Sequence, residues 1–313
     1  MDGATLPRRR FPWVNVALFL TTVATTIVAG AGQAPLPQAG LSVRGVIEAG
    51  LPFSAAIVGI LLAHEMGHYL MARAWRVETT LPYFIPAPFG VGTFGAVIRI
   101  RSLMPSRRAV LDIGAAGPIA GFLVAVPLFA WGLAHSEVRP VGDLLASGTN
   151  TGSAYEILRA LWRSEALRWG RGDVQLMGDN LVTWLLGRLV SGTPPPGHDV
   201  FLHPVAFAAW LGLFVTTLNL IPIGQLDGGH VLYALLGQRR AEAASRLVSW
   251  GLFVAGLFLS WNWLVWWLLT RTVIGMRHPP ALAEEPLSPG GVALAAASLA
   301  LFFLTFIPVP ISV

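Results

Sequence analysis

Residues 50–72 read GLPFSAAIVGILLAHEMGHYLMA, an apolar run whose ionisable side chains are those of His64, Glu65 and His68. A helix needs about 20 mostly apolar residues to cross the hydrocarbon core of a bilayer, so the run predicts a transmembrane helix. Ionisable groups at membrane depth are costly and usually mark function. Three of them this close together also predict a chemical site inside the membrane.

The composition of the whole chain agrees with a membrane protein and narrows the chemistry. Of 313 residues, 54% are hydrophobic and 12% are charged, which is about half the charged share of an ordinary soluble domain. Cysteine is absent, which excludes disulfide frameworks, thiolate nucleophiles and cysteine-based zinc sites. Any metal must therefore be held by histidine and carboxylate. No nucleic acid partner is expected.

Further apolar runs predict additional spans at residues 13–31, 109–134, 205–223, 247–270 and 292–306. The run at 247–270 fits one long span or a hairpin that turns at residues 260–262, and the hairpin is favoured because it returns Arg271 and Arg277 to the cytoplasm. The fold class is an all-α polytopic membrane protein with about six or seven transmembrane helices. For the first run, a cleaved signal peptide is the alternative, although such apolar regions usually have about 7 to 15 residues.

Arginine placement predicts the orientation. Three arginines precede the first span, and six lie between residues 73 and 108; basic residues concentrate in cytoplasmic loops. The N-terminus is therefore expected in the cytoplasm and residues 135–203 outside, where 155–169 and 181–190 look like amphipathic surface helices. A bacterial inner (plasma) membrane is expected because no long serine-rich transit segment precedes the first span; a plastid membrane is the less favoured alternative.

The expected organisation has five parts. They are an N-terminal anchor with an external loop (1–49), a first core part with the cluster of ionisable residues (50–134), an external helical loop (135–203), a second core part (204–240) and C-terminal spans (241–313).

The motif His64-Glu65-Met66-Gly67-His68 has metal-site spacing, because residues four apart on a helix share one face. One zinc ion can bridge the two imidazoles, and the Glu65 carboxylate beside them can take a proton from water. Catalytic zinc sites use three protein ligands and leave a fourth position open. A third ligand is therefore required.

Several residues are candidates for that third ligand, and topology separates them. His64 and His68 lie in the cytoplasmic half of their span, so histidines on the outer side cannot reach them. Asp227 follows a span that also ends inside and is favoured over Asp112, which reads as an acid in the first turn of a helix. The candidates at membrane depth are Asp112, Asn219, Asp227 and His230, and those outside are His135, His198 and His203. His230 reads as a second partner of the site or as a locally hydrogen-bonded side chain.

Residues 81–101 cannot form a continuous helix, because they include Pro82, Pro86 and Pro88. Residues 94–101 alternate with the period of a strand. We expect a membrane-embedded loop or β-hairpin near the site. Such an element either pairs with an unwound substrate through its edge or merely fills the space between spans.

Two separated motifs resemble the site-2 protease family of intramembrane zinc metalloproteases. They are the HEMGH motif at 64–68 and NLIPIGQLDGGH at 219–230; GTFGA at 92–96 also resembles a segment of one branch. The resemblance implies that His64, His68 and Asp227 bind one zinc ion per chain. It further implies that Glu65 is the catalytic base and that Asn219 lies near the scissile carbonyl. A substrate would contact Thr93, Phe94, Gly95 and Ala96.

The chain departs from this family in one respect. Many bacterial relatives carry a PDZ domain between the metal-binding motifs, and residues 135–203 are too few and too helical in pattern for one. The expected function is hydrolysis of peptide bonds in or near transmembrane segments, in regulated intramembrane proteolysis or the clearance of signal-peptide remnants. The partners are the lipid bilayer and these substrates. The alternatives are a metal-binding transporter and a non-catalytic scaffold.

Overall fold

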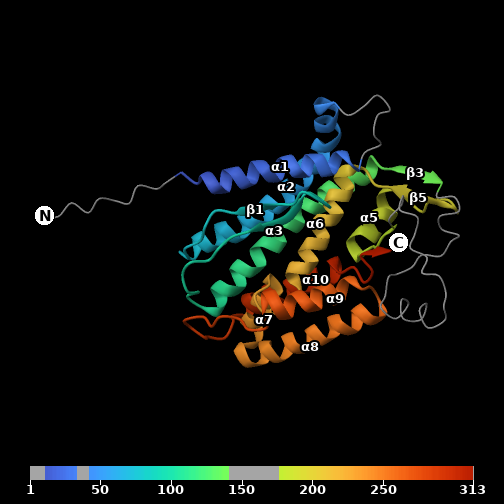
Figure 1. Cartoon of the computed structure of the whole chain (residues 1–313). Helices are drawn as coiled ribbons and strands as arrows, with labels where there is room; N and C mark the ends of the chain where they lie inside the picture. Colours follow the sequence, from blue (N-terminus) through green and yellow to red (C-terminus); the bar gives the residue numbers. More distant parts are fainter. Residues whose placement is uncertain (1–10, 34–41, 141–175, 313) are drawn as a thin grey trace.

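The computed structural model describes residues 11–33, 42–140 and 176–312 and is mostly helical (Figure 1). The helices are α1 (Trp13–Ala31), α2 (Val43–Ala74), α3 (Arg107–Ala134), α5 (Leu181–Val190), α6 (Pro204–Leu220), α7 (Asp227–Leu236), α8 (Gln238–Phe258), α9 (Asn262–Leu269), the π-helical turn η2 (Thr270–Ile274) and α10 (Pro289–Thr305). The strands are β1 (Tyr83–Pro86), β2 (Thr93–Val97), β3 (Glu137–Pro140), β4 (Leu176–Met177), β5 (His198–Phe201) and β6 (Ile311–Ser312). They form three antiparallel pairs, β1–β2, β3–β5 and β4–β6.

Three helices, α1, α2 and α3, are long and apolar enough to cross a membrane. The apolar runs predicted at 205–223 and 292–306 are helices as well, but α6 and α10 are shorter than the length that defines a candidate span. The structure thus supports a membrane protein with at least these three candidate spans. The count of six or seven stays a prediction.

The helix boundaries follow local chemistry. Ser42 and Ser106 cap α2 and α3, each accepting a backbone N–H bond on its hydroxyl oxygen, as preferred at helix starts. α6 ends at Leu220, just before Pro222, which cannot donate a helical hydrogen bond. α3 begins at Arg107, so Asp112 lies beyond its first turn; the expectation of a first-turn acid was wrong.

The stretch 247–270 forms a hairpin, as favoured from its arginines. α8 ends at Phe258, α9 begins at Asn262, and the two helices pack side by side (Figure 1). A glycine permits this close packing: a Cβ on Gly256 would lie 2.4 Å from Cγ of Leu264. The turn itself is closed by backbone bonds from Trp263 to Ser260 and from Leu264 to Trp261.

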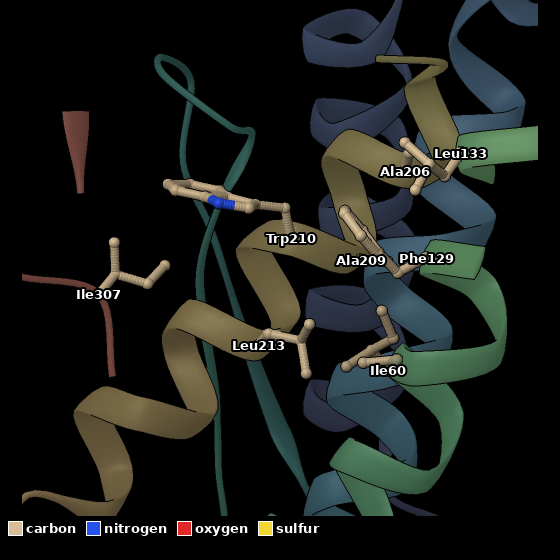
Figure 2. Packing of buried hydrophobic residues seen from close by; sticks show 9 residues of the cluster. Ile60, Phe129, Leu133, Ala206, Ala209, Trp210, Leu213 and Ile307 are labelled. Carbon is tan, nitrogen blue, oxygen red and sulfur yellow. The ribbon is translucent and has the colours of Figure 1, made fainter. Parts of the chain in front are cut away.

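The central core joins α2, α3 and α6. Figure 2 shows Ile60 of α2 and Phe129 of α3 packed against the α6 side chains Ala209 and Leu213, with Trp210 beside them. In lipid, such helices associate through close van der Waals packing rather than by the hydrophobic effect, so small residues at the interface matter. Gly132 of α3 shows how close the packing is, because a Cβ there would lie 2.4 Å from the backbone nitrogen of Ala206.

The predicted embedded loop is a β-hairpin. β1 pairs with β2 in the register Tyr83↔Val97 and Phe84↔Ala96, and the register then shifts before Pro86↔Thr93. Two residues of β2 therefore oppose one of β1, which is a β-bulge. Gly95 lies in this bulge with φ +98, a conformation that residues with a side chain rarely adopt.

One end of the molecule carries α5 and the β3–β5 ribbon (Figure 1). The predicted surface helix at 181–190 is α5, and Leu181, Leu185 and Leu189 are exposed along one of its faces. The other predicted surface helix, 155–169, lies outside the described residues.

Candidate metal centre

α2 presents His64 and His68 on one face, one helical turn apart. Both imidazoles are buried, and their Nε2 atoms lie 3.1 Å from each other. Nδ1–H of His68 donates a hydrogen bond of 2.7 Å to the carbonyl oxygen of Ile113 on α3. This bond fixes the tautomer of His68, so that its Nε2 carries a lone pair into the site.

The turn between α6 and α7 brings Asp227 to the same point. Oδ2 of Asp227 lies 3.3 Å from Nε2 of His64 and 3.3 Å from Nε2 of His68. The glycines after it make the turn possible: a Cβ on Gly228 would lie 2.0 Å from the carbonyl oxygen of Leu220. A Cβ on Gly229 would meet the Gly224 carbonyl at 2.3 Å. The Asp-Gly-Gly sequence therefore folds the start of α7 back against the end of α6.

These three side chains fit a zinc ion. Their donor atoms all lie within 4.8 Å of one another, and the separations of 3.1 to 3.3 Å match the spacing of about 3.3 Å between ligands at a tetrahedral zinc with bonds of about 2.0 to 2.1 Å. Two imidazole nitrogens and one carboxylate oxygen are a donor set that catalytic zinc sites use. Zinc is therefore the metal that the group supports.

A row of glycines on α3 makes room for the histidines. A Cβ on Gly117 would lie 2.1 Å from Nε2 of His68. A Cβ on Gly121 would lie 3.3 Å from Nδ1 of His64, and one on Gly114 would lie 2.6 Å from Cβ of His230. Small residues in an apolar helix predict close helix packing in general. Sequence spacing alone does not show that they face imidazoles.

The other acidic candidate, Asp112, has different partners. Its Oδ1 lies 2.7 Å from Nε of Arg108, and its Oδ2 accepts a hydrogen bond of 3.3 Å from Nε1 of Trp75. It is not part of the group that could hold a metal. Asp112 thus forms an ion pair with Arg108 within α3, and its hydrogen bond from Trp75 joins the start of α3 to the end of α2.

The histidines that were predicted on the outer side also lie apart from the metal group. His135 at the end of α3 and His203 at the start of α6 lie near each other, with ring centroids 6.2 Å apart. His198 is on β5 and its Nδ1 approaches the carbonyl oxygen of Pro196. We expected that these histidines would not reach the metal site, and the metal group consists of His64, His68 and Asp227 without them.

Glu65 and Asn219 border the metal group. Glu65 is 6% exposed, interacts with the backbone of Ile98 just after β2, and lies within electrostatic range of His68 and Asp227. The amide nitrogen of Asn219 lies 3.2 Å from Nε2 of His64. The base candidate and the amide candidate thus meet at the site, one from α2 and the other from α6.

The predicted substrate-contacting residues lie on β2 and its bulge. Phe94 is 64% exposed, and its ring meets that of Phe89 edge to face at 5.6 Å. Thr93 is buried, and its hydroxyl donates to the carbonyl oxygen of Ile85 at 3.0 Å. Phe94, Gly95 and Ala96 are therefore the accessible members of the set, and Thr93 holds the hairpin together.

Sequence reasoning missed a histidine pair behind the site. Nδ1 of His230 lies 2.5 Å from Nε2 of His278, whose own Nδ1–H donates to the carbonyl oxygen of Pro279. His278 also stacks on the ring of Tyr233 at 4.1 Å. The partner of His230 is thus distant in sequence rather than local. Burial, together with the neighbouring His230, lowers the pKa of His278 to about 3.

The comparison with protein families agrees with this geometry. The model of peptidase family M50 matches residues 52–261, which include both metal-binding motifs and the hairpin. The chain belongs to peptidase family M50. Within this M50 protein, the matched segment begins inside α2 and ends at the turn between α8 and α9.

Several curated plant proteins are similar to this M50 chain. The probable zinc metalloprotease EGY1, chloroplastic, of Arabidopsis thaliana is 30% identical over 269 residues, covering 84% of this chain and 44% of the relative. EGY2 of the same plant is 28% identical over 266 residues, with 85% and 42% covered. EGY3 of Oryza sativa subsp. indica is 27% identical over 291 residues, with 90% and 45% covered. The chain thus spans less than half the length of these relatives. No solved structure matches it.

Proposed function

We propose that this chain is a zinc metalloendopeptidase that hydrolyses peptide bonds within or near transmembrane segments of other membrane proteins. The observation that carries the proposal is the convergence of His64, His68 and Asp227 beside the buried Glu65. The M50 family match and the printed names of the relatives, which are probable zinc metalloproteases, support the same class of reaction.

Each residue of the site has a chemical role in this proposal. His64, His68 and Asp227 would hold the zinc ion, which when bound supplies Lewis-acid chemistry that polarises a carbonyl and acidifies water. Glu65 is the general base: its carboxylate takes a proton from the attacking water and returns it to the leaving amine. Asn219 donates a hydrogen bond to the oxygen of the scissile carbonyl as negative charge develops there.

The hairpin supports the capture of a substrate. A helical segment hides its carbonyl groups in its own hydrogen bonds, so it must be extended before cleavage. β1 is a poor edge for a new strand because it is flanked by Pro82 and ends at Pro86, and proline blunts strand edges. β2 contains no proline, and the Ile98 backbone that follows it contacts Glu65. An extended substrate added to β2 by β-augmentation would lie close to the base.

The membrane setting completes the proposal. In a bacterial inner membrane, the start of α1 and the metal site would face the cytoplasmic side, the orientation that the arginine distribution favours. The first catalytic part is residues 50–134 and the second is residues 204–240. Among the described residues, one group of three is placed to share an ion, which gives a transport pathway with successive metal sites no support.

A comparison of wild type with Glu65→Gln tests the proposal. Both proteins are purified in detergent, their zinc content is measured, and cleavage of a membrane-spanning test substrate is followed. We expect the variant to keep its zinc and to lose cleavage by a factor of about 10²–10⁴, the usual contribution of a general base. Equal cleavage would remove Glu65 as the base. Full zinc occupancy without cleavage by wild type would favour a scaffold.

A further inference from the structure

The first helix holds the hairpin at two points. Near its start, Nδ2 of Asn15 donates hydrogen bonds to the carbonyl oxygens of Leu81 (3.1 Å) and Pro82 (2.9 Å), directly before β1. Near its end, the hydroxyl of Thr25 lies 2.6 Å from the carbonyl oxygen of Gly92, directly before β2. This is its shortest contact, since the carbonyl oxygens of Thr21 and Thr22 in α1 itself lie 3.0 and 3.1 Å away. Each of the bonds to the hairpin joins α1 to a segment more than 60 residues away in the sequence.

The spacing of these bonds matches the length of the strand that they flank. The ten residue-to-residue steps from Asn15 to Thr25 in α1 rise about 15 Å. The five residue-to-residue steps from Pro82 to Ala87 extend about 17 Å along a strand, and the backbone N–H of Ala87 bonds to the carbonyl oxygen of Gly92 at 3.0 Å. α1 therefore runs beside β1 along the whole length of the strand.

Two apolar contacts support the same alignment. Phe19 of α1 packs edge to face on Phe84 of β1, with ring centroids 5.1 Å apart. At the hairpin tip, a Cβ on Gly92 would lie 2.6 Å from the Thr25 carbonyl oxygen and from Cα of Thr26. The tip therefore lies directly on the α1 backbone, and a glycine is needed there.

These contacts have a consequence for the strand on the other side. α1 covers β1, and Thr26 of α1 in turn bonds to Ser54 of α2 at 2.7 Å between hydroxyl oxygens. α1 thus connects the hairpin to α2, the helix that carries His64 and Glu65. β2 contacts α2 and touches α1 only slightly, and its Phe94 and Val97 side chains are exposed.

We propose that Asn15 and Thr25 are positioning residues that fix the hairpin at both ends of β1 and so present β2 to the substrate beside Glu65. This inference rests on the proposed proteolytic function. α1 lies outside the matched family segment, and neither residue touches the metal group or Glu65. Their effect is therefore on how the substrate is captured and not on the reaction at the zinc.

The experiment compares Asn15→Leu and Thr25→Val with two matched variants. Thr21→Val removes a hydroxyl from the same helix, but that hydroxyl bonds to the Ala17 carbonyl of α1 itself. Thr25→Ser keeps the hydroxyl that reaches Gly92. We expect Thr25→Val to raise KM for a membrane-spanning substrate about two- to tenfold, the equivalent of one lost hydrogen bond, and Asn15→Leu, which loses two bonds, to raise KM at least as much. kcat and zinc content should stay at wild-type values, as should KM in Thr21→Val and Thr25→Ser.

A second measurement does not depend on cleavage. The chain has no cysteine, so Ile85→Cys, at a β1 position that is 39% exposed, accepts a single nitroxide label. Label mobility should rise in Asn15→Leu and Thr25→Val and stay unchanged in Thr21→Val. Unchanged mobility and KM in the first two variants would overturn the inference, as would a loss of zinc in step with cleavage. If wild type cleaves no substrate while mobility responds as expected, the proposed function fails and the positioning of the hairpin stands.

Discussion

Gly117 lies so close to His68 that a methyl group in place of its hydrogen would come within 2.1 Å of the imidazole Nε2. That nitrogen is one of the three donor atoms of the metal group. The α3 backbone therefore forms a wall of the metal site. The same helix also orients His68 through the carbonyl oxygen of Ile113.

Gly117→Ala should consequently remove zinc without removing any ligand. The new methyl group must displace the His68 ring, and the three donor atoms then no longer converge. The check is zinc content after purification, measured by elemental analysis. Gly59→Ala is the matched control, because Gly59 is also in a helix and no neighbouring atom lies within 4 Å of the position that its new methyl group would take; it should keep full zinc. Equal zinc in both variants would contradict the close contact.

The two aspartates should behave differently towards metal. Asp227→Ala is expected to lower zinc occupancy severely, because it removes one of three ligands. Asp112→Ala should leave occupancy unchanged, since Asp112 pairs with Arg108 and Trp75 instead. Zinc titration of both purified variants measures the difference. Loss of zinc in Asp112→Ala with retention in Asp227→Ala would reverse the ligand assignment.

Asn219 should affect the rate and not the metal. If its amide donates to the developing oxyanion, Asn219→Ala should reduce kcat by a factor of about 10²–10³. The nearby His64 should still bind zinc. Steady-state kinetics and metal analysis of the same preparation separate the two effects. A zinc loss as large as that of Asp227→Ala would instead make Asn219 a residue that positions His64.

Gly95 should be required for the shape of β2. Its φ of +98 disfavours a side chain, and forcing one into such a conformation costs about 1–2 kcal/mol. Gly95→Ala should therefore disturb the bulge and reduce cleavage while zinc content is unchanged. Gly251→Ala serves as the control: that glycine also has open surroundings but lies within helix α8, and cleavage should persist.

His278 should make the fold sensitive to acid. Its pKa is lowered from the ordinary value of 6.5 to about 3, so between these values the unfolded chain binds a proton that the folded chain does not. Stability is therefore lost as pH falls below about 6.5. The groups around it are His230, the Tyr233 ring and, hydrogen-bonded to Tyr233, Glu284.

The corresponding measurement is the thermal midpoint of unfolding between pH 7 and pH 4. His278→Asn should show a smaller decrease across this range than wild type, whatever its stability at pH 7. His198→Asn, which changes an exposed histidine on β5, should decrease as wild type does. Parallel curves for all three proteins would mean that His278 does not set the acid response.

Much of the site could be predicted from the sequence because its candidate ligands and its candidate base lie in two short motifs. The spacing of His64 and His68 needs only one helical turn, and Asp227 follows from the direction in which its span ends. Helix positions were predictable for a similar reason, since apolar runs and prolines are local signals. The run at 13–31 and the predicted α5 match their helices from first to last residue.

The rest depends on contacts between distant segments. Nothing near Gly117 in the sequence shows that it faces His68, and nothing near Asn15 shows that it bonds to the carbonyl groups before β1. The pairing of His230 with His278 joins α7 to a loop 48 residues later. Such relationships are set by how the helices pack, which a periodic pattern does not encode.

The ligands of the metal group are also far apart along the chain, and this sets the order of events during synthesis. Both histidines are inserted with α2, but the carboxylate at position 227 is translated only after the hairpin and α3 and α6 are complete. A nascent chain that stops before that point has two ligands and no third. All three side chains can therefore share an ion only after the hairpin, α3 and α6 have been synthesised.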